Sequence, residues 1–357
     1  MKVLAYLPID AIVKTWARRL EADGHEVETT YTFTVFARRV RWADWTLANA
    51  TKNDAPRYAW KLLLSLLWAR LLGRKVALFI SIDLVDLCDR PVLRAVLWTI
   101  NWITFHCATL VILLATREHV ARRYRLPNAR RLLVYNCPDR ATFAPAGATR
   151  RVADQPHSPL TFLYHGELLW WHGLERFLPI YEEIRRRRPA RLIVMGNFYP
   201  SVFRLFGLVA SRREAAIKRQ LAALLERQDV EYLGHVPIEQ LRRLMSEADF
   251  HVSQLNDEDI MARTELRTGL LEAMASGMVC LHVPAPALTP DVFRDGENIV
   301  LVNPHDPAAA ADNILSWADS PARLEAVRRH AIQTIADHFD IEEEYAKAAA
   351  ALSGQRG

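Results

Sequence analysis

One glutamate in this sequence stands where a carboxylate is able to bind a ligand. Glu272 lies in the segment 264–277 (TELRTGLLEAMASG), which follows an expected strand and opens an expected helix that Gly277 ends. A carboxylate on the first helical turns, beside backbone N–H groups, can hold sugar hydroxyls and the phosphate of a nucleotide. The same spacing also suits an ordinary amphipathic helix with a glycine cap, so the pattern alone leaves both roles open.

Strands and helices that would position such a residue alternate along the whole chain. Continuous apolar runs at 76–82 and 108–115 are typical of buried parallel strands, and each is followed by a helical stretch. Residues 144–159 (APAGATRRVADQPHSP) break the pattern, which restarts at Leu160. The predicted fold class is therefore α/β, with two Rossmann-like lobes facing an inter-lobe cleft where the carboxyl ends of the strands gather.

The predicted domain boundaries follow from this break. We expect an N-terminal lobe at 1–145, a linker at 146–159, a C-terminal lobe at 160–335, and a last helix at 336–357 that crosses back to the first lobe. A chain of 357 residues exceeds what one hydrophobic core usually serves, which agrees with two lobes.

Composition narrows the classes of partner. The net charge of +5 favours anionic partners, and no zinc finger or aromatic nucleic-acid-binding strand is visible, so we expect no nucleic acid. The four cysteines lack CxxC spacing, which argues against a metal or disulfide framework and suits the cytoplasm. The apolar N-terminus is too short for a signal peptide, and no apolar run is long enough to span a membrane.

Two segments nevertheless carry a membrane-like composition. Residues 57–75 (RYAWKLLLSLLWARLLGRK) and 92–105 (VLRAVLWTINWITF) are apolar and rich in tryptophan, and cations rim the first. Such a pattern predicts either docking at a membrane surface or a buried core helix, and both interpretations stay open.

The C-terminal half resembles a known enzyme family. LLEAMASG, preceded by EADFHVSQL and VEYLGHVPIEQLRRLMSEAD, together with YHGELLWWHGLERFL from Tyr164, is similar to the second lobe of family-4 retaining glycosyltransferases of the GT-B fold. ATREHVARRYRL and LLVYNCPDRATFAP resemble the end of that family's first lobe more loosely. The resemblance implies an acceptor-binding first lobe and a second lobe that binds a nucleotide-sugar donor.

The resemblance also assigns residues. Glu272 matches the second glutamate of the family's E-x7-E motif, which holds the donor ribose, while Thr264 occupies the place of the first, and Glu265 next to it is the candidate catalytic substitute. Glu167 and His172 stand where the family has a diphosphate-binding arginine and lysine. A cation there stabilises the leaving diphosphate, so Arg267 or the backbone near Gly269 would have to compensate. The remaining predicted donor contacts are Gly166, Gly173, Gly196 and Gly234.

Carboxylates elsewhere are secondary candidates. Asp83 follows the strand at 76–82, where the family often has a His-Asp pair; it can act in catalysis by orienting an acceptor hydroxyl, or cap the next helix. Asp10 is a second candidate acceptor contact. The acidic run Asp257–Asp259 is similar to the metal-binding D-x-D of the other major glycosyltransferase fold, but that fold has one Rossmann-like domain, so we expect a solvated loop and no metal.

The sequence thus predicts a glycosyltransferase that moves a sugar from a nucleotide-sugar donor to a saccharide or polyprenyl-linked acceptor. Retained configuration and independence of metal ions and cofactors follow from the resemblance, with a place in cell-surface glycan assembly. We expect a cytoplasmic protein, or one that is peripheral on the inner face of the cytoplasmic membrane. The alternatives are a non-catalytic GT-B partner in a glycan-assembly complex and a nucleotide-sugar epimerase.

Overall fold

The structure is a computed structural model that describes residues 1–6, 11–49, 55–145, 159–198, 204–205, 208–209 and 212–354. The chain forms two compact units. The first unit comprises Met1–Tyr135, Ser201–Arg212 and Glu342–Gly357, and the second comprises Asn136–Pro200 and Arg213–Ile341. Most of the expected linker at 146–159 lies outside the described residues.

The first unit is built on a six-stranded sheet with the order β2-β1-β3-β4-β5-β6, in which every neighbouring pair is parallel. Its strands are β1 (Lys2–Tyr6), β2 (Glu26–Thr30), β3 (Trp45–Asn49), β4 (Lys75–Ile80), β5 (Leu110–Leu114) and β6 (Arg131–Val134). The continuous apolar runs thus became central strands, as predicted. The pattern missed β3, which lies between β1 and β4.

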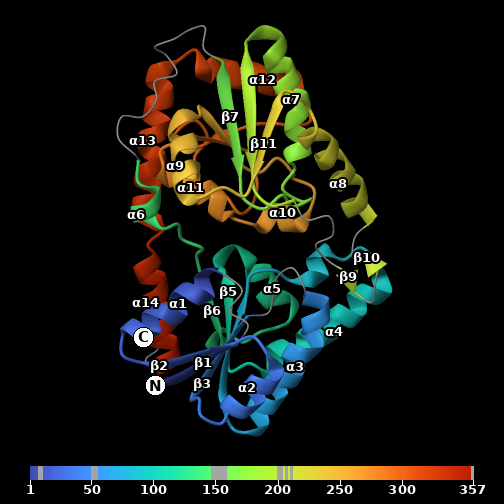
Figure 1. The fold of residues 1–357 in the computed structure, drawn as a ribbon, viewed down its shortest axis with the longest axis vertical. Helices are drawn as coiled ribbons and strands as arrows, with labels where there is room; N and C mark the ends of the chain where they lie inside the picture. Colours follow the sequence, from blue (N-terminus) through green and yellow to red (C-terminus); the bar gives the residue numbers. More distant parts are fainter. Residues whose placement is uncertain are drawn as a thin grey trace. The chain divides into compact units, whose positions relative to one another are not determined.

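Helices cover both faces of this sheet (Figure 1). Alternate residues of each strand pack on opposite faces: Val3 joins a core with α1 and α14, whereas Leu4 joins a core with α2 to α5. The bounds are α1 (Ala11–Ala22), α2 (Phe33–Arg39), α3 (Ala55–Leu71), α4 (Pro91–Cys107), α5 (Glu118–Arg123) and α14 (Ile341–Ser353). The last helix is fixed there because the carboxylate of Glu344 accepts the N–H of Tyr135, just after β6, at 3.0 Å.

A short antiparallel hairpin also belongs to the first unit, although it follows a strand of the second. It consists of β9 (Arg204–Leu205) and β10 (Leu208–Val209), and β9 contacts α3. Two-residue strands leave too short a pattern for sequence periodicity, so the hairpin was not predicted.

The second unit contains another six-stranded parallel sheet, with the order β11-β8-β7-β12-β13-β14. The strands are β7 (Leu160–His165), β8 (Ala190–Met195), β11 (Val230–Gly234), β12 (Phe250–Val252), β13 (Val279–His282) and β14 (Val300–Leu301). The helices are α6 (Arg140–Phe143), α7 (Phe177–Arg187), α8 (Arg212–Leu225), α9 (Ile238–Glu247), α10 (Ile260–Thr264), α11 (Thr268–Ala275), α12 (Pro307–Ala318) and α13 (Pro321–His338). Each unit is thus α/β with a parallel sheet, which confirms the predicted fold class.

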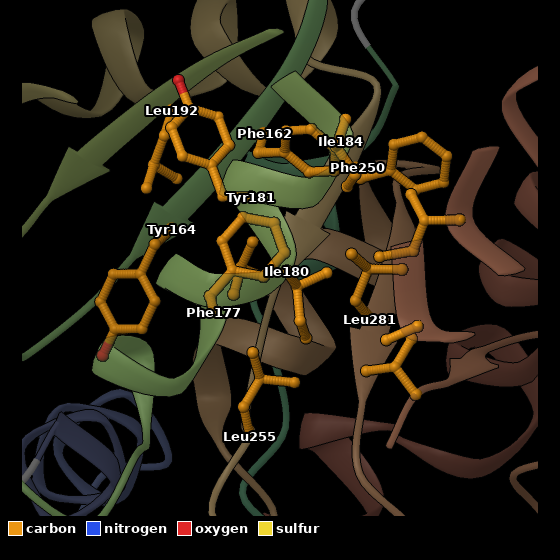
Figure 2. Packing of buried hydrophobic residues seen from close by; sticks show 14 of the residues in the cluster. Phe162, Tyr164, Phe177, Ile180, Tyr181, Ile184, Leu192, Phe250, Leu255 and Leu281 are labelled. Carbon is orange, nitrogen blue, oxygen red and sulfur yellow. The ribbon is translucent and has the colours of Figure 1, made fainter. Parts of the chain in front are cut away.

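An aromatic cluster forms the centre of the second unit (Figure 2). The ring of Phe162 in β7 lies 5.1 Å from that of Phe177 in α7 and 5.6 Å from that of Phe250 in β12, measured between centroids. All three side chains are fully buried. This packing fixes β7 and β12 against α7, so the loops that leave their carboxyl ends start from a rigid platform.

Candidate functional site

Glycines at the ends of three neighbouring strands bring the backbone of the second unit close together. Gly166, Gly196 and Gly234 follow or end β7, β8 and β11, and each has a positive φ. A Cβ at Gly196 would lie 1.7 Å from the carbonyl oxygen of Gly166, so no side chain fits there. Gly173 is equally constrained, because its Cβ would lie 2.5 Å from the backbone nitrogen of Asn256. These predicted donor-binding glycines all lie at or beside the carboxyl edge of the sheet.

Glu272, the predicted ribose ligand, faces the end of β7. Its Oε2 lies 3.0 Å from Nε2 of His165, the last residue of β7, and its side chain stays 21% exposed. Gly269 allows this approach, because a Cβ there would lie 3.3 Å from the same Nε2. The carboxylate is therefore fixed on its inner side and still reachable from solvent.

Arg267 at the N-cap of α11 joins the ends of two strands. Its guanidinium donates to the hydroxyl of Tyr164 at 3.0 Å, to the carbonyl of His165 at 3.2 Å and to the carbonyl of Ser253. The residue is only 4% exposed. The structure gives Arg267 a place in the framework of the site, and its predicted contact with a diphosphate stays a prediction.

Glu265, the candidate catalytic carboxylate, is anchored by two neighbours from the loop after β7. Its Oε2 accepts the indole N–H of Trp171 at 2.6 Å and lies 3.3 Å from Nε2 of His172. Burial and the charge of Arg267 lower the pKa of His172, so this imidazole is neutral at neutral pH. His172 therefore lacks the positive charge of the lysine whose place it takes.

The remaining predicted donor contacts make local bonds. Thr264 donates its hydroxyl to the carbonyl of Ile260 at 2.7 Å within α10. The backbone carbonyl of Glu167 accepts the hydroxyl of Tyr164 at 2.8 Å. Burial raises the pKa of Tyr164 to about 12, so it remains a phenol that can donate this bond. The bond from Tyr164 shapes the loop after β7 without involving the carboxylate of Glu167.

Asp83 of the first unit is enclosed in a polar network after β4. Its carboxylate accepts the backbone N–H of Val85 at 3.1 Å, the amide of Asn101 at 2.9 Å and the guanidinium of Arg123 at 2.6 Å, and Tyr124 adds its hydroxyl at 3.2 Å. The side chain is fully buried. This geometry supports the capping role considered from the sequence and disfavours direct contact with an acceptor. Asp10 lies outside the described residues.

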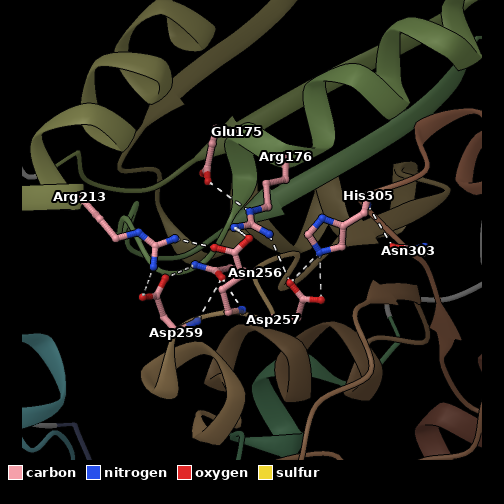
Figure 3. Close-up of polar contacts among 9 residues, drawn as sticks. Glu175, Arg176, Arg213, Asn256, Asp257, Asp259, Asn303 and His305 are labelled. Carbon is pink, nitrogen blue, oxygen red and sulfur yellow. Dashed lines mark hydrogen bonds and ion pairs between the residues drawn. The ribbon is translucent and has the colours of Figure 1, made fainter.

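The acidic loop after β12 is partly exposed and forms an ion-pair network (Figure 3). Arg176 lies 3.3 Å from Asp257 and 3.0 Å from Glu258, and Arg213 lies 3.2 Å from Asp259. Nε2 of His305 lies 3.1 Å from both carboxylate oxygens of Asp257. Asp257, Glu258 and His305 are close enough to share a cation, but the arginines already neutralise much of this charge. The expected solvated loop is therefore observed in part: the side chains of Asp257 and Glu258 stay 34% and 45% exposed, while two arginines pair with the acidic run from the turn before α7 and from α8.

Glu175 beside this loop gives a pH-dependent prediction. Burial, with help from Asp259 and Glu258, raises its pKa from 4.5 to about 7. A raised pKa means that the folded state binds the proton more tightly, so this group's contribution to stability is lost as the pH rises from about 4.5 through about 7. Glu175→Gln is expected to remove this slope and to raise the free energy of unfolding at pH 8 by up to about 3 kcal/mol. Urea unfolding of both proteins at pH 5 and pH 8 tests this; an unchanged slope in the variant would contradict it.

Sequence reasoning missed three contributors to the site. His165, Tyr164 and Trp171 lie in the segment YHGELLWWHG. From this segment the sequence indicated only the two glycines and the two positions where the family has an arginine and a lysine. A signal was present for His165, because a polar side chain that ends a buried parallel strand points toward the edge where ligands bind.

This chain is similar to known proteins in both sequence and structure. Residues 159–320 match the family model described as glycosyl transferases group 1. Sucrose-phosphate synthase from Thermosynechococcus elongatus aligns over 99% of this chain and 98% of its own, at 15% identity and a TM-score of 0.72. Anabaena HepE, solved in complex with UDP and glucose, aligns over 99% and 100%, at 16% identity and a TM-score of 0.68. No curated protein matches the sequence.

The similarity over nearly the whole chain gives this protein the GT-B fold of glycosyltransferases. Within that fold, residues 159–320 form a group 1 glycosyltransferase domain, which contains every predicted donor contact. The chain accordingly contains a glycosyltransferase domain, as the resemblance implied.

Proposed function

We propose that this glycosyltransferase transfers a sugar from a uridine-diphosphate sugar to a saccharide or lipid-linked acceptor in cell-surface glycan assembly. Retention of configuration, with no metal or cofactor, is the chemistry that the family resemblance implies. HepE, which shares the fold, was solved with UDP and with UDP-glucose, which makes uridine the first base to test.

The observation that carries this proposal is the setting of Glu272. Its carboxylate combines partial exposure with a fixed orientation, and it stands over the carboxyl edge of β7 inside the group 1 domain. A carboxylate held in this way is suited to accept the hydroxyls of a donor ribose. Glu265, anchored by Trp171, supplies a second fixed carboxylate in the same domain.

The experiment is a melting-temperature panel with UDP, GDP, ADP, dTDP and CDP. A nucleotide at a hundred times its dissociation constant stabilises the native state by about 2.7 kcal/mol, which moves the melting temperature of a protein of this size by a few degrees. We expect UDP to give the largest shift, and radiolabelled sugar transfer to a mixed saccharide and lipid fraction to follow. If no nucleotide shifts the melt of well-folded protein, the donor site is refuted.

A non-catalytic role in an assembly complex is the second candidate. It is favoured by the neutral state of His172 and by the engagement of Arg267, because neither supplies a free positive charge for a leaving diphosphate. The two candidates differ in turnover. UDP binding without transfer or hydrolysis of UDP-glucose would support the second.

A membrane location is supported by one surface of the first unit. We call it the α3–α4 face, and seven of the thirteen exposed large hydrophobic side chains of the described residues lie on these two helices: Leu64, Trp68, Leu71, Val92, Val96, Trp98 and Trp102. Neither helix contains an acidic residue, and Arg70 and Arg94 are exposed on them. No helix in the described part of the chain is long and apolar enough to span a membrane. Exposed tryptophans with cations and no anions are typical of docking to an anionic lipid surface.

This location predicts lipid binding that depends on both features. The protein should sediment with vesicles containing a third phosphatidylglycerol and much less with pure phosphatidylcholine. Trp68→Ser combined with Trp102→Ser is expected to weaken binding about tenfold, because it removes two large aromatic side chains from the α3–α4 face. Tyr31→Ser, which alters an even more exposed aromatic residue outside these helices, is the control. Equal binding of all variants would contradict the assignment.

A further inference from the structure

Three buried histidines lie on neighbouring strands beneath the α11 helix. His165 ends β7 at 4% exposure, and His251 in β12 and His282 in β13 are fully buried. The rings of His165 and His251 lie 4.8 Å apart between centroids. Buried imidazoles are costly to retain in a sheet core, so each calls for a physical reason.

Of these three histidines, His165 is the one whose ring contacts Glu272, the predicted ligand of the donor ribose. We infer that His165 is a positioning residue, whose imidazole Nε2–H holds the carboxylate of Glu272 in the orientation that accepts a donor ribose hydroxyl. This inference rests on the proposed function, because the ribose contact of Glu272 is part of it.

The side chain of His165 is buried, and its neighbours restrict rotation of the imidazole ring. A Cβ added to Gly269 would lie 3.1 Å from the carbonyl oxygen of His165 and 3.3 Å from its Nε2, so α11 packs directly on this residue. His251 lies beside the ring, and the carbonyl of His165 accepts from Arg267 at 3.2 Å. The imidazole is thereby held with Nε2 toward Glu272.

The charges around this pair favour one proton arrangement. Burial and the neighbouring His165 and Arg267 lower the pKa of His251 well below its usual value, and burial lowers that of His282 to about 4, so both are neutral. Among the described residues, the guanidinium of Arg267 and the carboxylate of Glu272 contact His165. A carboxylate accepts hydrogen bonds, so Nε2 carries the proton, while Nδ1 is buried with no hydrogen-bond partner among the described residues.

Holding Glu272 in this way lowers the cost of binding. His165 contacts one carboxylate oxygen, and the Glu272 side chain as a whole stays 21% exposed and accessible to a ligand. A side chain that is already oriented loses little conformational freedom when the ligand arrives. The position directly before Gly166 therefore influences donor affinity without touching the donor.

The test compares two replacements of the imidazole. His165→Leu removes the N–H, and UDP affinity measured by calorimetry is expected to fall about tenfold, with donor KM raised and kcat changed much less. His165→Gln keeps an N–H donor and should recover part of the affinity. His282→Leu removes a neighbouring buried histidine that does not touch Glu272, so it should lower the melting temperature and leave UDP affinity unchanged.

Further readouts separate the inference from the proposed function. Imidazole nitrogen NMR of the ligand-free protein should show a proton on Nε2 of His165, and Gly269→Ala, which displaces the ring, should weaken UDP binding like His165→Leu. An Nδ1–H tautomer would overturn the inference, as would UDP affinity equal in the wild type and in His165→Leu. If the wild type fails to bind UDP or any nucleotide of the panel, the proposed function fails first. In that case the tautomer still reports on the contact between His165 and Glu272.

Discussion

Replacing Glu272 by alanine is expected to lower kcat/KM for the donor by about a hundredfold. The change removes an ionised acceptor from the site, and hydrogen bonds to charged groups contribute about 1.5–3 kcal/mol each. It also removes the acceptor that lies 3.0 Å from Nε2 of His165, so this N–H loses its partner. Initial rates at varied UDP-sugar concentration measure the effect, and the stabilisation of the native state by UDP should disappear with it.

A second variant separates the charge of this residue from its shape. Glu272→Gln keeps the length of the side chain and one oxygen that can accept from His165, so we expect a loss of about tenfold rather than a hundredfold. Glu325→Gln in α13, where the carboxylate is 63% exposed and lies 3.9 Å from Arg328, is the control for simple loss of charge. Full activity in Glu272→Ala would show that the donor ribose is held elsewhere.

The sequence predicted most of the fold because burial in a parallel sheet leaves a direct pattern. β5 is apolar throughout and β4 is apolar after its first residue, Lys75, as is typical of strands covered on both faces. Trp45–Asn49 escaped detection although all five residues are buried, because its threonine and asparagine interrupt the apolar run. The helix α7 begins only at Phe177, since Gly173 is left-handed, with φ 76°, and a 3-10 turn follows it.

The candidate site was predictable in place but not in its contacts. Glycines and polar residues after strands indicated the carboxyl edge of the second sheet, and the structure puts them there. The partners depend on packing between distant segments: Glu272 meets His165 across 107 residues, and Arg267 meets Tyr164 across 103. Arg267 therefore suggested a free cation in the sequence, whereas in the fold its donors are used to join strands. The family resemblance could not show that Arg267 is engaged in this way, because it assigns residues to sequence positions and does not show which side chains they contact in the fold.

Gly196→Ala is expected to be the most destabilising single change in the second unit. Gly196 has a φ of 136°, where an L side chain is strained, and its Cβ would lie 1.7 Å from the carbonyl oxygen of Gly166. That neighbour is backbone, which cannot turn aside as a side chain would. Since the N–H of Gly196 also bonds the carbonyl of Gly234 at 2.8 Å, the ends of β7, β8 and β11 would all have to shift. We expect a loss of more than about 4 kcal/mol in the free energy of unfolding, or no folded protein.

Gly234→Ala at the end of the adjacent strand provides the matched comparison. Its φ of 62° is also positive, but a Cβ there would meet no atom within 4 Å, so the cost is limited to backbone strain of about 1–2 kcal/mol. Thermal and urea unfolding of the two variants measure the difference. A large gap would mean that the glycines after β7 and β8 are required by packing, before any ligand binds. Equal, small losses would mean that this edge can open, and the close approach of Gly166 and Gly196 would then be better explained by room for a donor than by the fold.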